Sequence, residues 1–284
     1  MSVRAETIPV GRPRPGLAVR AVRAIREHML AVFAAAVLVY LLLPIAVVAL
    51  FSFNDPAGRY NYTWQGFTLD HWLNPFAVPG LQDAITVSIE IALLASLVAT
   101  ILGTPIALAL ARYRYRGRGA TNTLVFMAMT APEIVLGASL LTLFLNLGVA
   151  RGFWTILFAH VMFNISFVVV TVRARLVGFD RHLEEAAMDL GATPWTTFAR
   201  VTLPLIAPGI LAGALLAFAL SIDDFIITNF NSGATVTFPM FVWGAARVGA
   251  PPQVNVIGTI IFVVAVGLML ANVLFQQRRL KGAA

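Results

Sequence analysis

The stretch EEAAMDLGATPWTTFARVTLPLIAPGI, residues 184–210, is charged and interrupted by prolines inside a chain that is otherwise mostly apolar. Of the 284 residues, 59% are hydrophobic and only 12% are charged, and the mean hydropathy is +0.85. This composition lies outside the range of ordinary globular domains and is typical of a membrane protein. The polar stretch is therefore expected to be a loop between two membrane spans.

Six segments are apolar and long enough to cross a bilayer as helices, which takes about 20 residues each. They cover residues 29–51, 84–111, 122–147, 153–172, 208–232 and 256–275, and none contains Lys or Arg. The sequence thus predicts an all-α, polytopic membrane protein. Its expected parts are an Arg-rich tail (1–28), one six-helix domain (29–280) that includes the polar loop 173–207, and a short tail (281–284).

The basic residues predict how the chain is oriented. Seventeen of the 20 Lys and Arg residues lie in the N-terminal tail, in 112–118, in 173–200 and in the C-terminal tail, and the other three connections hold one Arg each. Because connections rich in Lys and Arg stay in the cytoplasm, this alternation predicts an even number of spans with both termini cytoplasmic. The net charge of +7 is then explained by topology and by contact with membrane lipid, not by nucleic-acid binding.

Several kinds of chemistry are missing from the sequence. The chain has no cysteine, which excludes disulfides, thiolate metal sites and cysteine nucleophiles. Neither His-Glu-x-x-His nor Gly-x-Ser-x-Gly occurs, so an intramembrane enzyme is disfavoured and no catalytic residue or metal site is predicted. The sole lysine, Lys281, lies near the C-terminus and cannot belong to a P-loop. If ATP drives this protein, another chain must bind the nucleotide, and this chain binds no cofactor.

The polar loop has the pattern of a helix, a tight turn and a second helix. Asp180 can cap the first helix, whose apolar residues recur at helical spacing: Leu183, Ala186, Ala187 and Leu190. Gly191 suits the left-handed position that ends a helix, and Thr193 followed by Pro194 is a helix start. The second helix is expected to end before Leu203-Pro204, because the residue before proline is disfavoured in the α region.

Such a hairpin could lie on the membrane surface or could bind a partner protein. A helix on an anionic membrane usually carries Lys or Arg on its polar face. This helix instead carries Glu184, Glu185 and Asp189. A protein partner is therefore the better interpretation.

Glu185-Ala186-Ala187, three residues, Gly191, nine residues and then Val201-Thr202-Leu203-Pro204 resembles the EAA signature of ABC importer permeases. The spacing agrees throughout, and the one departure is Val201 where the family usually has Ile. The resemblance implies a type I importer permease fold and a coupling helix that docks on a cytoplasmic ATPase dimer, which would bind ATP and Mg. The residues it implies in coupling are Glu184, Glu185, Ala186, Ala187, Asp189, Gly191, Leu203 and Pro204.

The fifth predicted span contains two acids, Asp223 and Asp224, near its middle. An Asp at the bilayer centre costs about 2.5–3.5 kcal/mol on insertion scales, so the pair is a candidate functional site. On an uninterrupted helix, a polar stripe that could line a water-filled path would be formed by Ser221, Asp224, Thr228 and Asn231. Asp223 would then face a neighbouring helix. The alternative is that both acids are paired or hydrogen-bonded for packing.

Two further acids, Glu90 and Glu133, lie at membrane depth, whereas the spans contain no Lys or Arg. This imbalance favours a cation as the transported solute, although Glu133 follows Pro132 and could equally bond to backbone exposed at a proline kink. His160 and Asn164 are too few for a metal site and are expected to form interhelical hydrogen bonds.

Residues 220–259 and the SFND stretch at 52–55 are similar to the second permease of spermidine/putrescine importers. This resemblance covers about residues 29–280. It implies a bacterial inner-membrane protein that works with a second, paralogous permease and an extracytoplasmic polyamine-binding protein. The residues expected to line the pathway are Asp223, Asp224, Phe225, Thr228, Asn231, Glu133 and Glu90. The alternatives are an ABC permease for another small solute and an ion-driven transporter or channel, which leaves the EAA-like loop unexplained.

Overall fold

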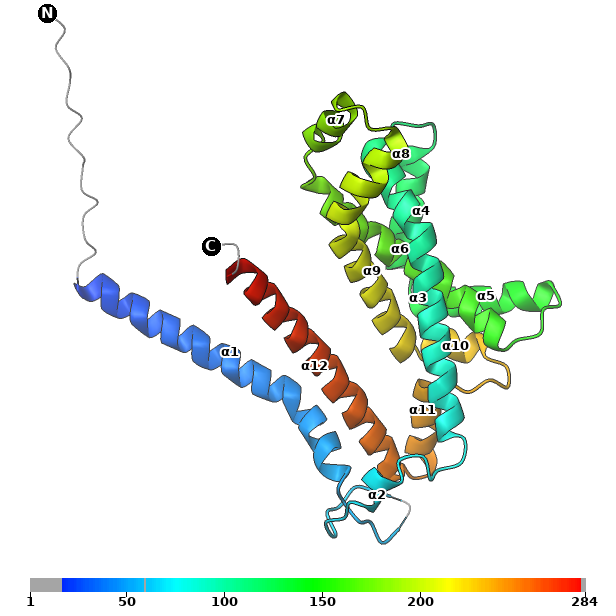
Figure 1. Cartoon of the computed structure of the whole chain (residues 1–284). Helices are drawn as coiled ribbons and strands as arrows, with labels where there is room; N and C mark the ends of the chain where they lie inside the picture. The colour runs from blue at the N-terminus through cyan, green and yellow to red at the C-terminus, as the bar shows by residue number, and fades with distance from the viewer. Residues whose placement is uncertain (1–16, 59, 282–284) are drawn as a thin grey trace, which may run out of the picture. The chain divides into compact units, whose positions relative to one another are not determined.

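The computed structural model describes residues 17–58 and 60–281 of the chain (Figure 1). In order, the helices are α1 (Leu17–Phe51), α2 (Asp70–Leu73), α3 (Leu81–Arg112), α4 (Arg118–Thr130), α5 (Glu133–Asn146), α6 (Phe153–Val177), α7 (His182–Asp189), α8 (Pro194–Thr197), a π-helical turn (Phe198–Thr202), α9 (Leu203–Asp223), α10 (Ile226–Asn231), α11 (Phe238–Val248) and α12 (Pro252–Lys281). The described residues contain no β-strand, only an isolated bridge between Asn54 and Phe67. The prediction of an all-α chain is confirmed.

Four helical segments of the described chain are long and apolar enough to cross a membrane. They are His28–Phe51, Leu81–Arg112, Phe153–Val177 and Pro194–Asp223. A fifth is reached if α4 and α5 are counted together as one broken span. The sixth predicted span falls in α12, whose apolar part within the described residues, Pro252–Gly267, is shorter than a full crossing. The count of six therefore stays a prediction.

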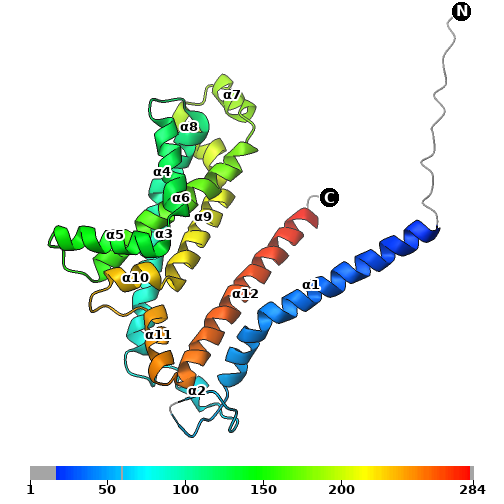
Figure 2. The ribbon, with the colours of Figure 1, turned by 180° about the vertical axis from the view of Figure 1, so that it is seen from behind.

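The third predicted span, 122–147, is not one straight helix. α4 and α5 meet at an angle of 106° at a break over Ala131 and Pro132, both of which have extended backbone angles. The cause is local, because a proline pushes the residue before it out of the α region and cannot itself donate to the preceding turn. In both views of the chain α5 projects sideways from the other helices, beside α10 (Figures 1 and 2).

The prediction for the fifth span, 208–232, is wrong at both ends. Its helix is continuous from Pro194 and ends at Asp223. Asp224 follows with φ −65° and ψ 121°, an extended conformation that interrupts the hydrogen-bond ladder before α10. The acid pair thus lies at a break between two helices and not in the middle of one.

The chain divides into two compact units, and the larger consists mainly of residues 74–251. Its core is the contact between α3, α6 and α9, which run side by side in both views (Figures 1 and 2). Small and β-branched residues fill this contact, including Ala99, Ala107, Val168, Val172 and Ala217, none of them more than 1% exposed. Gly103 lets α3 approach α6 closely, because a Cβ there would lie 2.8 Å from Cγ1 of Val168.

The other unit combines α1, α2 and α12 with the loop that follows α1. Asn54, fully buried, organises this loop: its side-chain amide donates to Asn61 at 2.6 Å and to the carbonyl of Thr63 at 2.9 Å. Beside it, the ring of Phe53 stacks on Trp72 of α2 at 5.2 Å. Two residues of the SFND stretch, Phe53 and Asn54, therefore have a structural role in this loop.

Candidate functional site

The polar loop folds as the predicted helix–turn–helix. α7 ends in a Schellman motif: the N–H of Gly191 donates to the carbonyl of Met188 and the N–H of Ala192 donates to that of Ala187. Gly191 has φ +88°, the left-handed conformation that glycine adopts without a steric penalty. The carboxylate of Asp180 accepts the N–H of His182 at 3.0 Å, but the N-cap residue of α7 is Arg181, one residue later than predicted.

The second helix starts as predicted but does not end as predicted. The hydroxyl of Thr193 accepts the N–H of Thr196, and Pro194 is the first helical residue. The helix then passes through Leu203-Pro204 without ending, because the π-helical turn replaces the α-helical hydrogen bonds there and the N–H of Leu203 donates to the carbonyl of Phe198, five residues back. The expectation that proline would end this helix is wrong for that reason.

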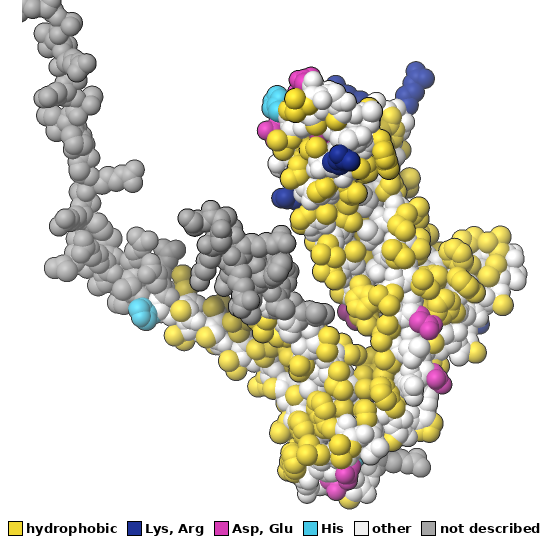
Figure 3. Space-filling view, viewed as in Figure 1, with side chains coloured by type: hydrophobic (Ala, Val, Ile, Leu, Met, Phe, Trp, Pro, Cys, Tyr) yellow, Lys and Arg dark blue, Asp and Glu magenta, His cyan; other side chains and the backbone are white. Residues whose placement is uncertain are grey.

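The apolar side chains of this hairpin are exposed within the chain. Leu190 is 90% exposed, Trp195 74% and Leu183 48%. Arg side chains gather at the same end of the larger unit, around α7 and α8 (Figure 3). An exposed apolar surface rimmed by polar groups is characteristic of an interaction site.

Adjacent residues of α7 point in opposite directions. The side chain of Glu185 is 62% exposed and contacts His182 of its own turn. That of Glu184 is 14% exposed and bonds to Arg112 at the end of α3 and to Thr202 of the π-helical turn. Ala186, Asp189 and Gly191 are exposed as well, and Ala187 is partly exposed. Leu203 and Pro204 lie at the start of α9 and are exposed.

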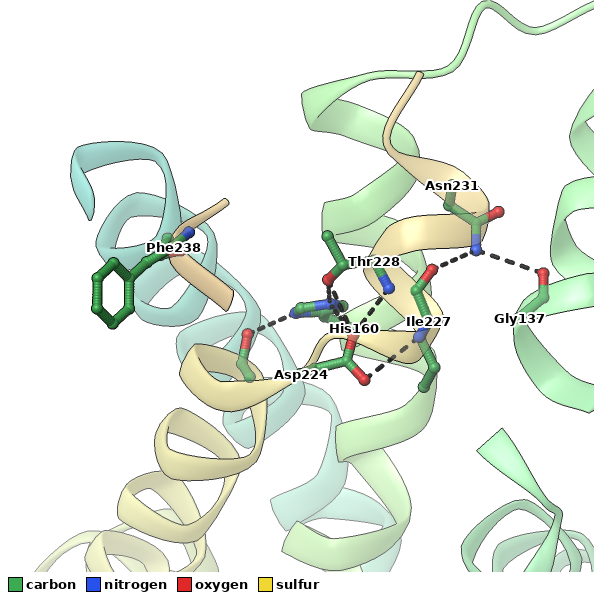
Figure 4. A network of polar contacts seen from close by, with 9 residues as sticks. Gly137, His160, Asp224, Ile227, Thr228, Asn231 and Phe238 are labelled. Carbon is green, nitrogen blue, oxygen red and sulfur yellow. Dashed lines mark hydrogen bonds and ion pairs between the residues drawn. The ribbon is translucent and has the colours of Figure 1, made fainter. Parts of the chain in front are cut away.

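A buried polar network holds the break between α9 and α10 (Figure 4). Asp224 caps α10: one carboxylate oxygen accepts the backbone N–H and the hydroxyl of Thr228, each at 2.8 Å, and the other accepts the N–H of Ile227 at 3.4 Å. His160 reaches the same site from α6, with Nε2 3.2 Å from the Asp224 carboxylate and Nδ1 2.6 Å from the hydroxyl of Ser221. The carboxylate thus meets four donor groups while its side chain is only 6% exposed.

With Asp224 ionised, the hydrogen bonds around His160 are satisfied when Nε2 carries a proton. Thr228 has one hydroxyl proton, and it is donated to Asp224. The contact of 2.8 Å between the Thr228 oxygen and Nε2 therefore requires Nε2 to be the donor. His160 binds Asp224 through an N–H group in either charge state, so the buried acid has a basic partner from another helix.

The predicted polar stripe is not formed. Ser221, Thr228 and Asn231 are at most 5% exposed, and they bond to other helices instead of facing a path. The two acids also have the reverse of their expected positions: the side chain of Asp224 is 6% exposed, whereas Asp223 is exposed. The prediction assigned Asp224 to the pathway and Asp223 to a neighbouring helix because it assumed one continuous helix, with about 100° between residues, beyond Asp223.

The other predicted acids lie at the surface of the chain. Glu133 is exposed at the start of α5, close enough to Asp223 and Asp224 for their charges to interact. Glu90 is exposed on α3. The interhelical role expected of His160 is confirmed, but that of Asn164 is not, since its buried amide has no hydrogen-bond partner among the described residues.

Two residues beside the acids were not predicted. The ring of Phe225 packs against Trp243 of α11 with centroids 5.2 Å apart, and the guanidinium of Arg247 lies 5.0 Å from the Trp243 centroid on the same helix. The i, i+4 spacing of Trp243 and Arg247 was visible in the sequence, but their position next to Phe225 depends on how α11 folds back.

Comparisons with known proteins agree with this architecture. The family described as "Binding-protein-dependent transport system inner membrane component" matches residues 99–281. The spermidine/putrescine transport system permease protein PotC of Escherichia coli K12 is 38% identical over 88% of this chain and 94% of its own length. The putrescine transport system permease protein PotI of the same organism is 38% identical over 78% of this chain and 81% of its own length.

Solved structures show the same fold. The crystal structure of a bacterial ABC transporter that imports the acidic polysaccharide alginate contains a chain that matches 94% of this chain and 99% of its own length, with a TM-score of 0.63 and 19% identity. At this identity the likeness concerns the fold, which is that of the type I ABC importer permeases.

Proposed function

The chain belongs to the family of binding-protein-dependent transport system inner membrane components, the permeases of ABC importers, and we propose that the solute it carries is a polyamine. The observation that carries the proposal is the pair of exposed carboxylates, Asp223 and Glu133, at the break between α9 and α10 with an aromatic pair beside them. The relatives named for spermidine and putrescine transport support the same choice.

The chemistry of the break suits an organic cation. Polyamines carry several ammonium groups at neutral pH, and carboxylates and aromatic faces both attract such groups. Asp223 and Glu133 supply the charge, and Phe225 with Trp243 supplies the aromatic faces. Few contacts are needed, because a path that bound its cargo tightly would retain it.

The predicted pathway residues divide into two groups in this proposal. Asp223, Glu133, Glu90 and Phe225 attract the cation, since they lie on accessible surface of the chain. Asp224, Thr228 and Asn231 brace the break from inside, since their side chains are largely buried and each already forms hydrogen bonds within the chain. This division replaces the prediction that polar residues on one helix face line the path.

The permease also needs other subunits, because the family description names it as one component of a transport system that depends on a binding protein. We propose that α7 and its turn dock on a cytoplasmic ATPase dimer, which holds the ATP and Mg, while this chain binds no nucleotide. A second, paralogous permease completes the pathway and an extracytoplasmic protein delivers the polyamine. Both termini are then cytoplasmic, as the distribution of Lys and Arg along the sequence predicts.

Uptake by the full complex in proteoliposomes tests the proposal. Labelled spermidine, putrescine, a neutral amino acid and a sugar are offered with the binding protein outside and ATP inside. We expect ATP-dependent accumulation of the polyamines alone. Accumulation of a neutral solute without any polyamine would reject the polyamine as cargo while leaving the importer permease intact.

A further inference from the structure

Glu184 joins three segments that are far apart along the chain. Its carboxylate accepts a hydrogen bond of 2.6 Å from Nη1 of Arg112, the last residue of α3 and 72 positions earlier. The same oxygen accepts the hydroxyl of Thr202, the last residue of the π-helical turn that leads into α9. One carboxylate of the short helix α7 thus holds the ends of two long helices.

The surroundings stabilise this arrangement. The side chains of Arg112 and Glu184 are only 18% and 14% exposed, and Thr202 is buried. The guanidinium of Arg112 lies 4.9 Å from the ring centroid of Phe179, in the segment that leads to α7. In such a shielded place a charge-assisted hydrogen bond is stronger than at an open surface.

No other side chain of α7 has a hydrogen bond to α3 or α9 in the described part of the chain. Glu185 contacts His182 within α7 itself. The exposed apolar residues of α7 point away from the helices, where a partner can reach them. The side chain of Arg181, which precedes α7, also donates to the carbonyl of Arg112 at 3.4 Å, but only Glu184 bonds to both the end of α3 and the π-helical turn before α9.

We propose that Glu184 is a positioning residue for energy coupling: with Arg112 and Thr202 it forms a clamp that makes α3 and α9 follow the movement of α7. The inference rests on the proposed docking of α7 on the ATPase. Glu184 does not itself bind the ATPase, which distinguishes it from its neighbour Glu185. Removing the clamp should leave the complex assembled and ATP hydrolysis running while less solute moves per ATP.

The π-helical turn is consistent with such a joint. Its hydrogen bonds run over five residues instead of four, and such turns occur frequently at functional sites. It joins the docking hairpin to α9 at the residue that Glu184 holds. The clamp therefore acts where the regular α-helical hydrogen bonding between the hairpin and the span is interrupted.

A double-mutant cycle tests the clamp in the assembled importer. Glu184→Gln, Arg112→Gln and the double variant are compared with wild type for uptake, for ATP hydrolysed and for ATPase bound per permease. We expect each single variant to move about tenfold less solute per ATP, the change expected when a hydrogen bond to a charged group is lost. The double variant should lose no more than the worse single, because both act through one contact. Arg114→Gln is the matched control, because Arg114 is an exposed arginine two residues after Arg112. This variant should move as much solute per ATP as wild type.

Normal solute per ATP in both single variants, or losses that add in the double variant, would overturn the clamp. If the Gln variants do not assemble, the same cycle is run with Glu184→Asp and Arg112→Lys, which keep the charges but change the reach, with the same criteria. The proposed docking of α7 on the ATPase is tested separately, by substituting exposed residues of α7 and measuring how much ATPase binds. If those variants bind the ATPase as well as wild type does, the docking proposal fails, whatever the outcome for the clamp.

Discussion

Nε2 of His160 lies 3.2 Å from the carboxylate of Asp224, a buried contact that ties α6 to the break between α9 and α10. The two residues are 64 positions apart, and each has further hydrogen bonds to Ser221 or Thr228. Removing one member of a buried pair leaves the other charge or dipole without a partner. The contact therefore predicts different consequences for the two neighbouring acids.

Asp224→Ala should destabilise the protein strongly. It removes the cap of α10 and the partner of His160, and breaking a buried pair costs about 3–5 kcal/mol. Asp223→Ala is the matched control, since that side chain is exposed and should change stability little. The stability of both variants is measured by heating the purified complex and monitoring the loss of monodisperse particles. Equal loss in the two variants would show that Asp224 is not the structural member of the pair.

Asp223→Asn and Glu133→Gln should reduce polyamine uptake while the complex remains assembled. Each removes one exposed negative charge, and attraction near a protein surface amounts to a few kcal/mol before desolvation, so a loss of roughly tenfold is expected. Uptake is measured at limiting polyamine and normalised to assembled complex. Wild-type rates in both variants would mean that these acids do not attract the cargo.

Trp243→Leu should raise the polyamine concentration needed for half-maximal uptake about threefold. Leu keeps the apolar contact with Phe225 but removes the aromatic face, whose attraction for a cation is about 0.5–2 kcal/mol. Trp154→Leu is the control, because Trp154 is an exposed tryptophan at the start of α6 whose ring packs against Phe153 and not against Phe225. A similar shift in both variants would indicate a general effect of losing tryptophan at the membrane surface.

The sequence was most informative where structure depends on neighbours along the chain. Apart from a shift of one residue at the start of α7, the hairpin was predicted correctly, because the turn at Gly191 and the helix start at Thr193 involve residues no more than five apart. Glycine at the end of a helix and Thr-Pro at the start of one are local signals that predict the same structures in most proteins.

Long-range contacts account for the errors. Nothing near Asp224 marks the end of α9, because the apolar sequence continues and the break is held by His160 from α6. The opposite directions of Glu184 and Glu185 likewise depend on Arg112, 72 positions from Glu184. At Leu203-Pro204 the local rule itself failed, since a π-helical turn accommodated the proline.

Gly191→Val should weaken binding of the ATPase without unfolding the spans. At φ +88° a β-branched residue is strongly disfavoured, so the Schellman turn must rearrange and carry α7 and α8 with it. Left-handed backbone costs about 1–2 kcal/mol for a residue with a side chain, and more for valine. Gly178→Val is the control on the same connection, because its φ is −95° and its Cβ would meet no atom within 4 Å. Retention of ATPase by the Gly191 variant at the control level would contradict the docking role of this turn.

Gly103→Ala should destabilise the contact between α3 and α6, because the new Cβ would lie 2.8 Å from Cγ1 of Val168. Overpacking of this kind costs about 1–3 kcal/mol. Val168→Ala removes that Cγ1 atom, so the double variant should be more stable than the sum of the two single losses predicts. Gly119→Ala is the control, since a Cβ there meets nothing within 4 Å and alanine favours the helix. Thermal unfolding of the four variants decides the question, and strictly additive losses would mean that α3 and α6 can separate enough to accept the methyl group.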